Sequence, residues 1–150
     1  DSQKNRTKAR GFVFRKEANL IYKCHNCGKG ASFQNFLKHV DTKIYDDYIF
    51  ERYKKNLEHT DFIETQENTQ SSYHKLVLLS DRRDELKTYL AQNGIETKVH
   101  YTKTLDSKNV GQYPNAENMC AKALSLPIYP HLEMYEVDYI CERIRKFNGV

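Results

Sequence analysis

The chain has 150 residues, a formal net charge of +4 at pH 7 and no Trp, and its aromatic content comes from 11 Tyr and 7 Phe. No apolar run approaches the roughly 20 residues that cross a bilayer, and the amino end lacks the apolar segment of a secretory signal. We therefore expect a soluble, cytoplasmic protein with no membrane partner and with reduced cysteines. The chain opens with Asp1 rather than Met, which favours a fragment of a longer protein.

The charge is distributed unevenly along the chain. Residues 1–38 hold nine basic and two acidic residues, a net charge of +7, whereas residues 39–70 carry −4 and residues 71–150 carry +1. Residues 64–72, ETQENTQSS, are polar and show no periodic apolar pattern. Such a stretch is typical of a linker. We predict two regions, 1–57 and 71–150, joined by a linker over 58–70.

Residues 11–27 alternate apolar and polar side chains around a polar turn, which predicts a β-hairpin. The hairpin ends in Cys24-His25-Asn26-Cys27-Gly28. A Cys-x-x-Cys-Gly turn points two thiolates at one metal ion, so Cys24 and Cys27 are candidate zinc ligands. Because two thiolates are an incomplete ligand set, we expect zinc to bind weakly or between two chains. A plain dithiol and His25 as a third ligand are the alternatives.

Basic and aromatic residues are interleaved through the hairpin and the segment before it. Cations that follow phosphates and rings that stack on bases suit single-stranded DNA as a partner. The alternative is a solvated hairpin over a small aromatic core. The candidate nucleic-acid contacts are Lys4, Arg6, Lys8, Arg10, Phe12, Phe14, Arg15, Lys16, Tyr22, Lys23 and Lys29.

Two helices are predicted after the hairpin. Ser32 can cap a short helix over 32–40, because its hydroxyl oxygen can accept from the first free backbone amides. Residues 45–57 give a second helical pattern.

Three segments of this region carry a family resemblance: DSQKNRTKARGFVF, YKCHNCGKGASFQNFLKHV and YIFERYKK. They resemble the zinc-ribbon domain of T4-like phage DNA primases. Cys24 and Cys27 match the second cysteine pair of that family, whose first pair lies just before the position of Asp1. The resemblance implies DNA binding in a phage-infected cell, without polymerising activity, because the catalytic carboxylates of a primase belong to a later domain.

Residues 73–101 predict a strand, a helix and a second strand, with the strands over 73–79 and 95–101. Ser80 or Asp81 can cap the helix, and a stripe of apolar residues along it would face a core. Gly94 suits the left-handed residue that commonly ends a helix.

The rest of the chain predicts a loop over 102–112, a helix that opens at Pro114, an extended segment over 126–130 and an amphipathic helix over 135–147. Cys120 and Cys141 fall on the apolar stripes of these two helices, so we interpret both as core residues. The residues expected on the apolar side of the helix that opens at Pro114 are Ala116, Cys120, Ala123 and Leu124, and Cys141 belongs to the last helix.

A second resemblance rests on SSYHKLVLL, RRDELKTYLAQNGIETKVHY and YPNAENMCAKALSLPIYPHLEMYEVDYICERIRKF. These segments, which cover 71–150, resemble the carboxy-terminal small domain of the DegT/DnrJ/EryC1/StrS sugar aminotransferases. The resemblance implies a dimeric enzyme that uses pyridoxal phosphate (PLP) to transfer an amino group to a nucleotide-linked sugar. His100 and Tyr101 match a block at the substrate side of the cleft, so both are candidate substrate contacts. The large domain with the PLP lysine has no counterpart in these segments.

We therefore predict an α+β protein: a partial zinc-ribbon hairpin with short helices, then a small domain with a strand-helix-strand unit and two further helices. The leading hypothesis is an aminotransferase fragment that is inactive alone, in a bacterial or phage-infected cell. Its alternative is a nucleic-acid-binding zinc-ribbon module of a phage primase, and a third is an α+β protein that binds neither ligand. We also expect 71–150 to fold without residues 1–65.

Overall fold

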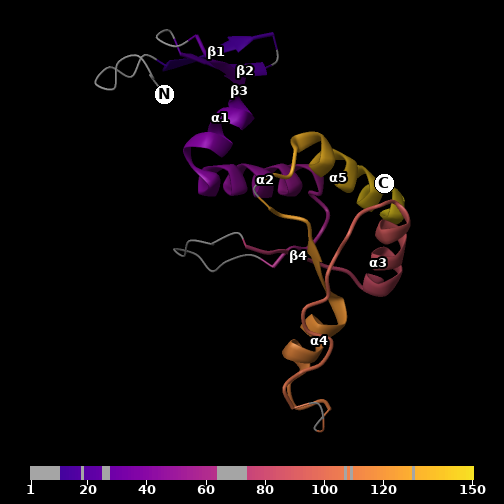
Figure 1. Cartoon of the computed structure of the whole chain (residues 1–150). Helices are drawn as coiled ribbons and strands as arrows, with labels where there is room; N and C mark the ends of the chain where they lie inside the picture. The colour runs from indigo at the N-terminus through magenta and orange to yellow at the C-terminus, as the bar shows by residue number, and fades with distance from the viewer. Residues whose placement is uncertain are drawn as a thin grey trace. The chain divides into compact units, whose positions relative to one another are not determined.

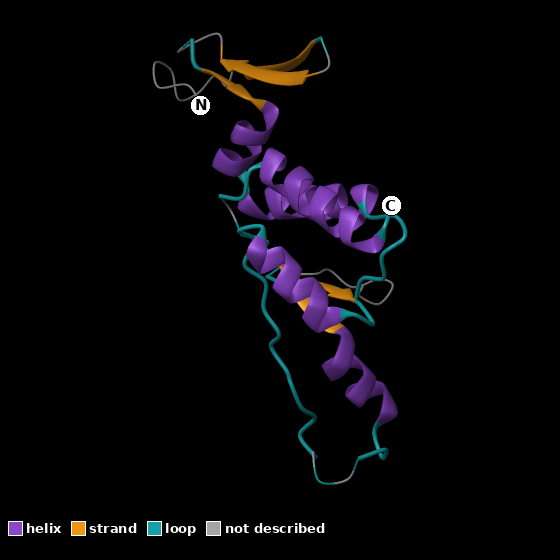
Figure 2. Ribbon diagram, turned by 90° about the vertical axis from the view of Figure 1, so that its right-hand side faces the viewer, coloured by secondary structure: helices purple, strands orange, loops and turns teal. Residues whose placement is uncertain are grey.

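The computed structural model describes residues 11–17, 19–24, 28–63, 74–106, 108, 110–129 and 131–150. The chain separates into two compact units, Asp1–Tyr45 and Asp46–Val150. Each unit combines helices with a small antiparallel sheet (Figure 2). The predicted α+β class is confirmed.

The first unit contains the predicted hairpin. Strands β1 (Gly11–Lys16) and β2 (Asn19–Cys24) pair antiparallel, and β3 (Gly30–Ser32) adds to the free edge of β2 (Figure 1). Helix α1 (Phe33–Val40) follows at once, and the backbone N–H of Asn35 donates to the Ser32 hydroxyl over 3.2 Å. The predicted serine cap is confirmed.

The sheet of the second unit is built around two paired strands. Strand β4 (Leu76–Leu79) pairs antiparallel with β5 (Ala123–Leu126), while Phe62 bridges to the outer edge of β4 and Lys98 to the outer edge of β5. The strand predicted over 95–101 is wrong in extent, because only Lys98 makes a ladder pair. Helix α4 (Pro114–Lys122) ends earlier than predicted, because Ala123 already has extended backbone and starts β5.

One face of this sheet forms the core of the unit. Side chains alternate between the two faces of a strand, so the register places Leu76, Leu78, Leu124 and Leu126 together, each at most 4% exposed. Helices α3 (Arg83–Gln92) and α5 (Met134–Asn148) contact each other, and α3 also contacts β5.

Cys141 and Cys120 were both predicted as core residues, and they differ in burial. Cys141 is fully buried on α5, and burial raises the pKa of its thiol to about 12, so its role as a core residue is confirmed. Cys120 is only half-buried.

The cap predicted for α3 is wrong: the Ser80 hydroxyl accepts from the Arg82 amide, which precedes the helix, and Arg82 itself is the N-cap. Gly94 has φ +75° after α3, as expected.

Helix α2 (Thr42–Asn56) contributes its second half to the core of the second unit. Ile49 and Tyr53 are fully buried there, and the Tyr53 hydroxyl donates to the carbonyl oxygen of Pro127 over 3.0 Å. Arg52 donates two hydrogen bonds of 2.8 Å to the two carboxylate oxygens of Asp138 on α5. The division between the units therefore falls inside α2, and residues 64–70 of the predicted linker lie outside the described residues.

Candidate functional site

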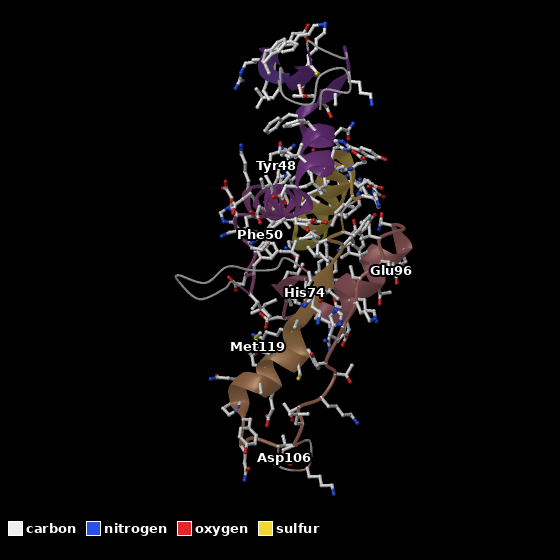
Figure 3. All side chains as sticks on the ribbon, turned by 60° about the vertical axis from the view of Figure 1, so that its left-hand side comes forward. Tyr48, Phe50, His74, Glu96, Asp106 and Met119 are labelled. Atoms are coloured by element: carbon white, nitrogen blue, oxygen red, sulfur yellow. The ribbon has the colours of Figure 1, made fainter. Side chains whose placement is uncertain are left out.

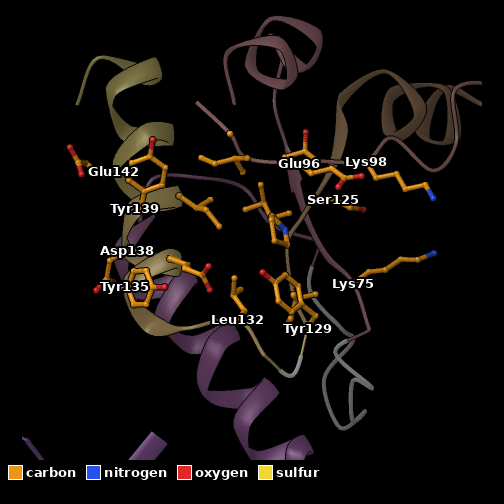
Figure 4. Close-up of a pocket in the computed structure, with 18 of the residues that line it drawn as sticks. Lys75, Glu96, Lys98, Ser125, Tyr129, Leu132, Tyr135, Asp138, Tyr139 and Glu142 are labelled. Carbon is orange, nitrogen blue, oxygen red and sulfur yellow. The ribbon is translucent and has the colours of Figure 1, made fainter. Parts of the chain in front are cut away.

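The second face of the β4–β5 sheet carries the candidate site. Ser125 of β5 pairs with Val77 of β4 on one side and with Lys98 on the other, so these three side chains share the face opposite the leucines. Lys75 lies two residues before Val77, and His100 two residues after Lys98. Lys75, Lys98 and Ser125 project to the same side of the sheet in Figure 4.

Two hollows meet at this face. The first, of about 1240 Å³, extends toward α5 and is lined by tyrosines and carboxylates that include Tyr129, Tyr135, Tyr139, Glu96 and Glu142. The second, of about 730 Å³, lies beneath α4. Lys75, His100 and Ser125 line both hollows.

The second hollow is mainly apolar. Its floor comes from the sheet through Val77 and Ala123, and one wall comes from α4 through Ala116 and Met119. The loop before α4 supplies a further wall that includes Asp106 (Figure 3). The hollow can therefore hold an apolar group next to a polar rim.

The two predicted substrate residues lie at this rim. His100 and Tyr101 are both exposed, with their ring centroids 6.4 Å apart, and the Lys75 ammonium is 5.8 Å from the centroid of the Tyr101 ring. Desolvation, followed by the positive charges of Lys75 and Lys98, lowers the pKa of His100. At neutral pH the imidazole is therefore mainly uncharged and can donate or accept a hydrogen bond.

Of the two predicted zinc ligands, only Cys24 belongs to the described residues. Cys24 is 1% exposed at the end of β2, where its amide donates to the Lys29 carbonyl over 2.8 Å. His25 and Cys27 lie outside the described residues. Within the described part of the chain, no group of three or more His, Cys, Asp and Glu residues could hold a metal ion. The described residues therefore give no support for a zinc site.

The predicted nucleic-acid residues fall on both faces of the hairpin sheet. Phe12 and Phe14 share one face, with their ring centroids 5.4 Å apart, and Lys23 lies directly across from Phe12. Tyr22 points to the other face, where it stacks on Phe36 of α1 at 4.1 Å. Arg15, Lys16 and Lys29 are exposed, whereas Lys4, Arg6, Lys8 and Arg10 lie outside the described residues.

Sequence reasoning missed Lys75, Lys98 and Ser125 as site residues. In the segment 96–100 polar and apolar side chains do not show which strand the segment would join. In the structure a single bridge, from Lys98 to Ser125, joins it to β5. For Lys75 a signal was available: side chains alternate between the two faces of a strand, so Lys75 lies on the face opposite Leu76 and Leu78 if the strand extends back to it.

The model of the DegT/DnrJ/EryC1/StrS aminotransferase family matches residues 31–145. Over 83 residues the chain is 35% identical to a pleiotropic regulatory protein of Geobacillus stearothermophilus, covering 50% of this chain and 22% of that protein. Over 91 residues it is 31% identical to the dTDP-3-amino-3,4,6-trideoxy-alpha-D-glucose transaminase of Streptomyces venezuelae, covering 55% of this chain and 24% of that enzyme. The chain thus spans about a quarter of the length of these curated relatives.

Among solved structures, the chain is similar to S. venezuelae DesV in complex with a ketimine intermediate, with a TM-score of 0.68 and 26% identity over 76% of this chain and 34% of that one. Its described helices are too short or too polar to cross a membrane. The comparisons do not show the resemblance to a primase zinc ribbon. The extent of the family match, together with the shared fold, establishes that this chain belongs to the DegT/DnrJ/EryC1/StrS aminotransferase family.

Proposed function

We propose that this chain forms the small-domain wall of the substrate cleft in a nucleotide-sugar aminotransferase, with His100 and Tyr101 as substrate contacts. The observation that carries the proposal is the position of these two exposed residues: both line the hollow under α4, and His100 also lines the first hollow. The transaminase name of the S. venezuelae relative supports the reaction class. By the same relationship we propose a cytoplasmic homodimer as the complete enzyme.

The described residues do not fit the PLP cofactor of the family. PLP needs an imine-forming lysine, and its ring needs a rigidly held partner for the ring nitrogen. Asp106 is the one carboxylate among the described residues that line the hollow under α4, and it follows the fully exposed Leu105 on a loop. We therefore propose that the chain by itself is inactive and that its catalytic lysine belongs to a large domain.

A chimera tests this role. Residues 46–150 would replace the matching segment of the S. venezuelae transaminase, and formation of its amino-sugar product would be measured. We expect turnover, with kcat/KM reduced roughly fivefold by His100→Ala, because one lost hydrogen bond costs about 1 kcal/mol. His131→Ala, at an exposed position that lines neither hollow, is the matched control. A folded chimera whose rate does not respond to His100→Ala would contradict the assignment.

A second candidate function concerns the first unit. Phe12 is 37% exposed beside Phe14, and Lys23 lies across the strand pair from it, so this face can stack bases next to a phosphate contact. We propose single-stranded DNA as its ligand. Fluorescence anisotropy with a labelled oligothymidylate should show salt-dependent binding. Phe12→Ala should weaken it, and Val40→Ala, at an exposed apolar position on α1, should not.

A further inference from the structure

The sequence contains two Asn-Gly pairs, and each of them ends a helix. Asn93 is the C-cap of α3 and is followed by Gly94 at φ +75°. Asn148 is the last residue of α5 and is followed by Gly149 at φ +80°. Two sites with the same local sequence and the same left-handed glycine can therefore be compared within one molecule.

The reactivity of such a pair follows from the missing side chain of glycine. Because no Cβ shields the glycine nitrogen, this nitrogen can attack the side-chain carbonyl carbon of the preceding asparagine after its amide proton has passed to hydroxide. The new C–N bond closes a succinimide ring, and the C–N bond of the side-chain amide breaks, so that ammonia leaves with a proton from water. Water then opens the ring to aspartate or isoaspartate, and no oxidant or reductant is needed.

Asn93 is held away from this reaction by hydrogen bonds. Its side-chain amide nitrogen donates to the Tyr89 carbonyl oxygen over 2.8 Å, and the Gly94 N–H donates to the Ala91 carbonyl oxygen over 3.1 Å. The backbone carbonyl oxygen of Asn93 also accepts from the Tyr139 hydroxyl of α5 over 3.2 Å. The attacking nitrogen and the leaving amide must therefore both give up a hydrogen bond before the ring can close.

Asn148 lacks most of these restraints. It is exposed, and its side-chain amide makes no hydrogen bond among the described residues. The Gly149 N–H lies 3.3 Å from the Lys146 carbonyl oxygen, which is longer than a typical hydrogen bond of this kind. The remaining tie is the bond of 3.0 Å from the Val150 N–H to the Arg145 carbonyl oxygen, and Val150 is itself 75% exposed. The last turn of α5 can therefore open at little cost, as helix ends commonly do.

We propose that Asn148 is a site of spontaneous deamidation in the folded protein and that Asn93 is protected. The conversion lowers the formal net charge of the chain by one, from +4 to +3. It places a carboxylate at the carboxyl end of α5, where the helix dipole disfavours negative charge. An isoaspartate also lengthens the backbone between positions 148 and 149, so the bonds that close the last turn lose their present geometry. The modification therefore loosens the end of α5 and leaves α3 intact.

Incubation of the full chain at mildly alkaline pH tests this proposal. Peptide mapping by mass spectrometry and labelling by an isoaspartyl methyltransferase measure the conversion at each asparagine. We expect Asn148 to convert roughly tenfold faster than Asn93, since the hydrogen bonds that restrain Asn93 must open first. In urea the two rates should become similar, because both asparagines precede glycine and neither keeps its hydrogen bonds.

Three variants sharpen the test. Asn148→Gln should suppress the conversion at position 148, because the longer side chain closes its ring much more slowly, and Asn93→Gln is the matched control that should leave it unchanged. Tyr139→Phe removes one restraint from Asn93 and should raise the conversion there but not at Asn148. Equal rates at the two asparagines in the native chain, or faster conversion at Asn93, would overturn the proposal. So would an Asn148 that stays intact in the native chain while the sample in urea converts.

Discussion

The two faces of the β4–β5 sheet differ in burial and in charge. The leucine face is closed: Leu76, Leu78, Leu124 and Leu126 are at most 4% exposed. The opposite face carries Lys75 and Lys98, with His100 next to it, and borders two hollows, of which the first is also lined by Leu126. The contrast shows that one short strand pair can hold a closed core on one side and a more exposed, charged surface on the other, because alternate residues belong to different surfaces. Changes on the first face should therefore alter stability, and changes on the second should alter binding.

The largest effect is expected from removing α2 and Leu57 just after it, which add further buried residues to the core of the second unit. Ile49, Tyr53 and Leu57 are each at most 3% exposed, and their loss would remove on the order of 6 kcal/mol of apolar burial. Contrary to the sequence-based expectation that 71–150 folds alone, we now expect the excised piece 46–150 to unfold cooperatively in urea and the piece 71–150 to be largely unfolded. Circular dichroism measures both. Equal stability of the two pieces would mean that α2 is dispensable, in agreement with the boundary predicted from the sequence.

The next effect separates the two faces directly. Leu124 is fully buried in β5, so Leu124→Ala should destabilise the chain by about 3 kcal/mol through lost burial and a cavity. Val77→Ala, on the half-buried opposite face, is its matched control and should cost about 1 kcal/mol or less. Urea unfolding midpoints at constant slope measure both. Similar losses at the two positions would contradict the division between the faces.

A smaller effect is expected at the ion pair between α2 and α5. Hydrogen bonding from Arg52 is the main cause that lowers the pKa of Asp138 from its ordinary value of 3.8. The side chains are 38% and 43% exposed, so solvent screening limits the pair, and Asp138→Asn should cost about 1 kcal/mol at neutral pH.

This cost should depend on pH in a defined direction. Because the folded pKa of Asp138 is depressed, its stabilisation is present above the ordinary carboxyl value and is lost as the pH falls through the folded pKa. Wild type and Asp138→Asn should therefore converge in urea midpoint below about pH 4. Glu142→Gln, at the exposed Lys146 pair, is the control and should change little at any pH. A difference that persists unchanged into acid would show that the ion pair is not its source.

The sequence predicted local features better than long-range ones. Ser32 and Gly94 act within one helical turn, and their roles follow from hydroxyl chemistry and from the absence of a Cβ. The start of β5 at Ala123 could not be read from ALSL, because helical and extended patterns are both compatible with so short an apolar run. The bidentate contact of Arg52 with Asp138 joins residues 86 positions apart, and no local pattern encodes it. The same holds for Lys75 and Lys98, which become neighbours only through the register of Ser125.

The last prediction is that the chain alone does not catalyse amino transfer on the face of the β4–β5 sheet that carries Lys75 and Lys98. Lys98 and Lys103 are exposed, Lys75 is half-buried, and the carboxylate that lines the hollow under α4 lies on a loop. None of these described lysines is therefore held in the enclosure that an imine with PLP requires. We expect PLP added to the full chain to give no defined imine absorbance and no amino transfer from glutamate. Borohydride reduction followed by peptide mapping should show scattered labelling of exposed lysines, including Lys87. A single labelled lysine, with turnover on a keto sugar, would show that this face is an active site and not one wall of a cleft.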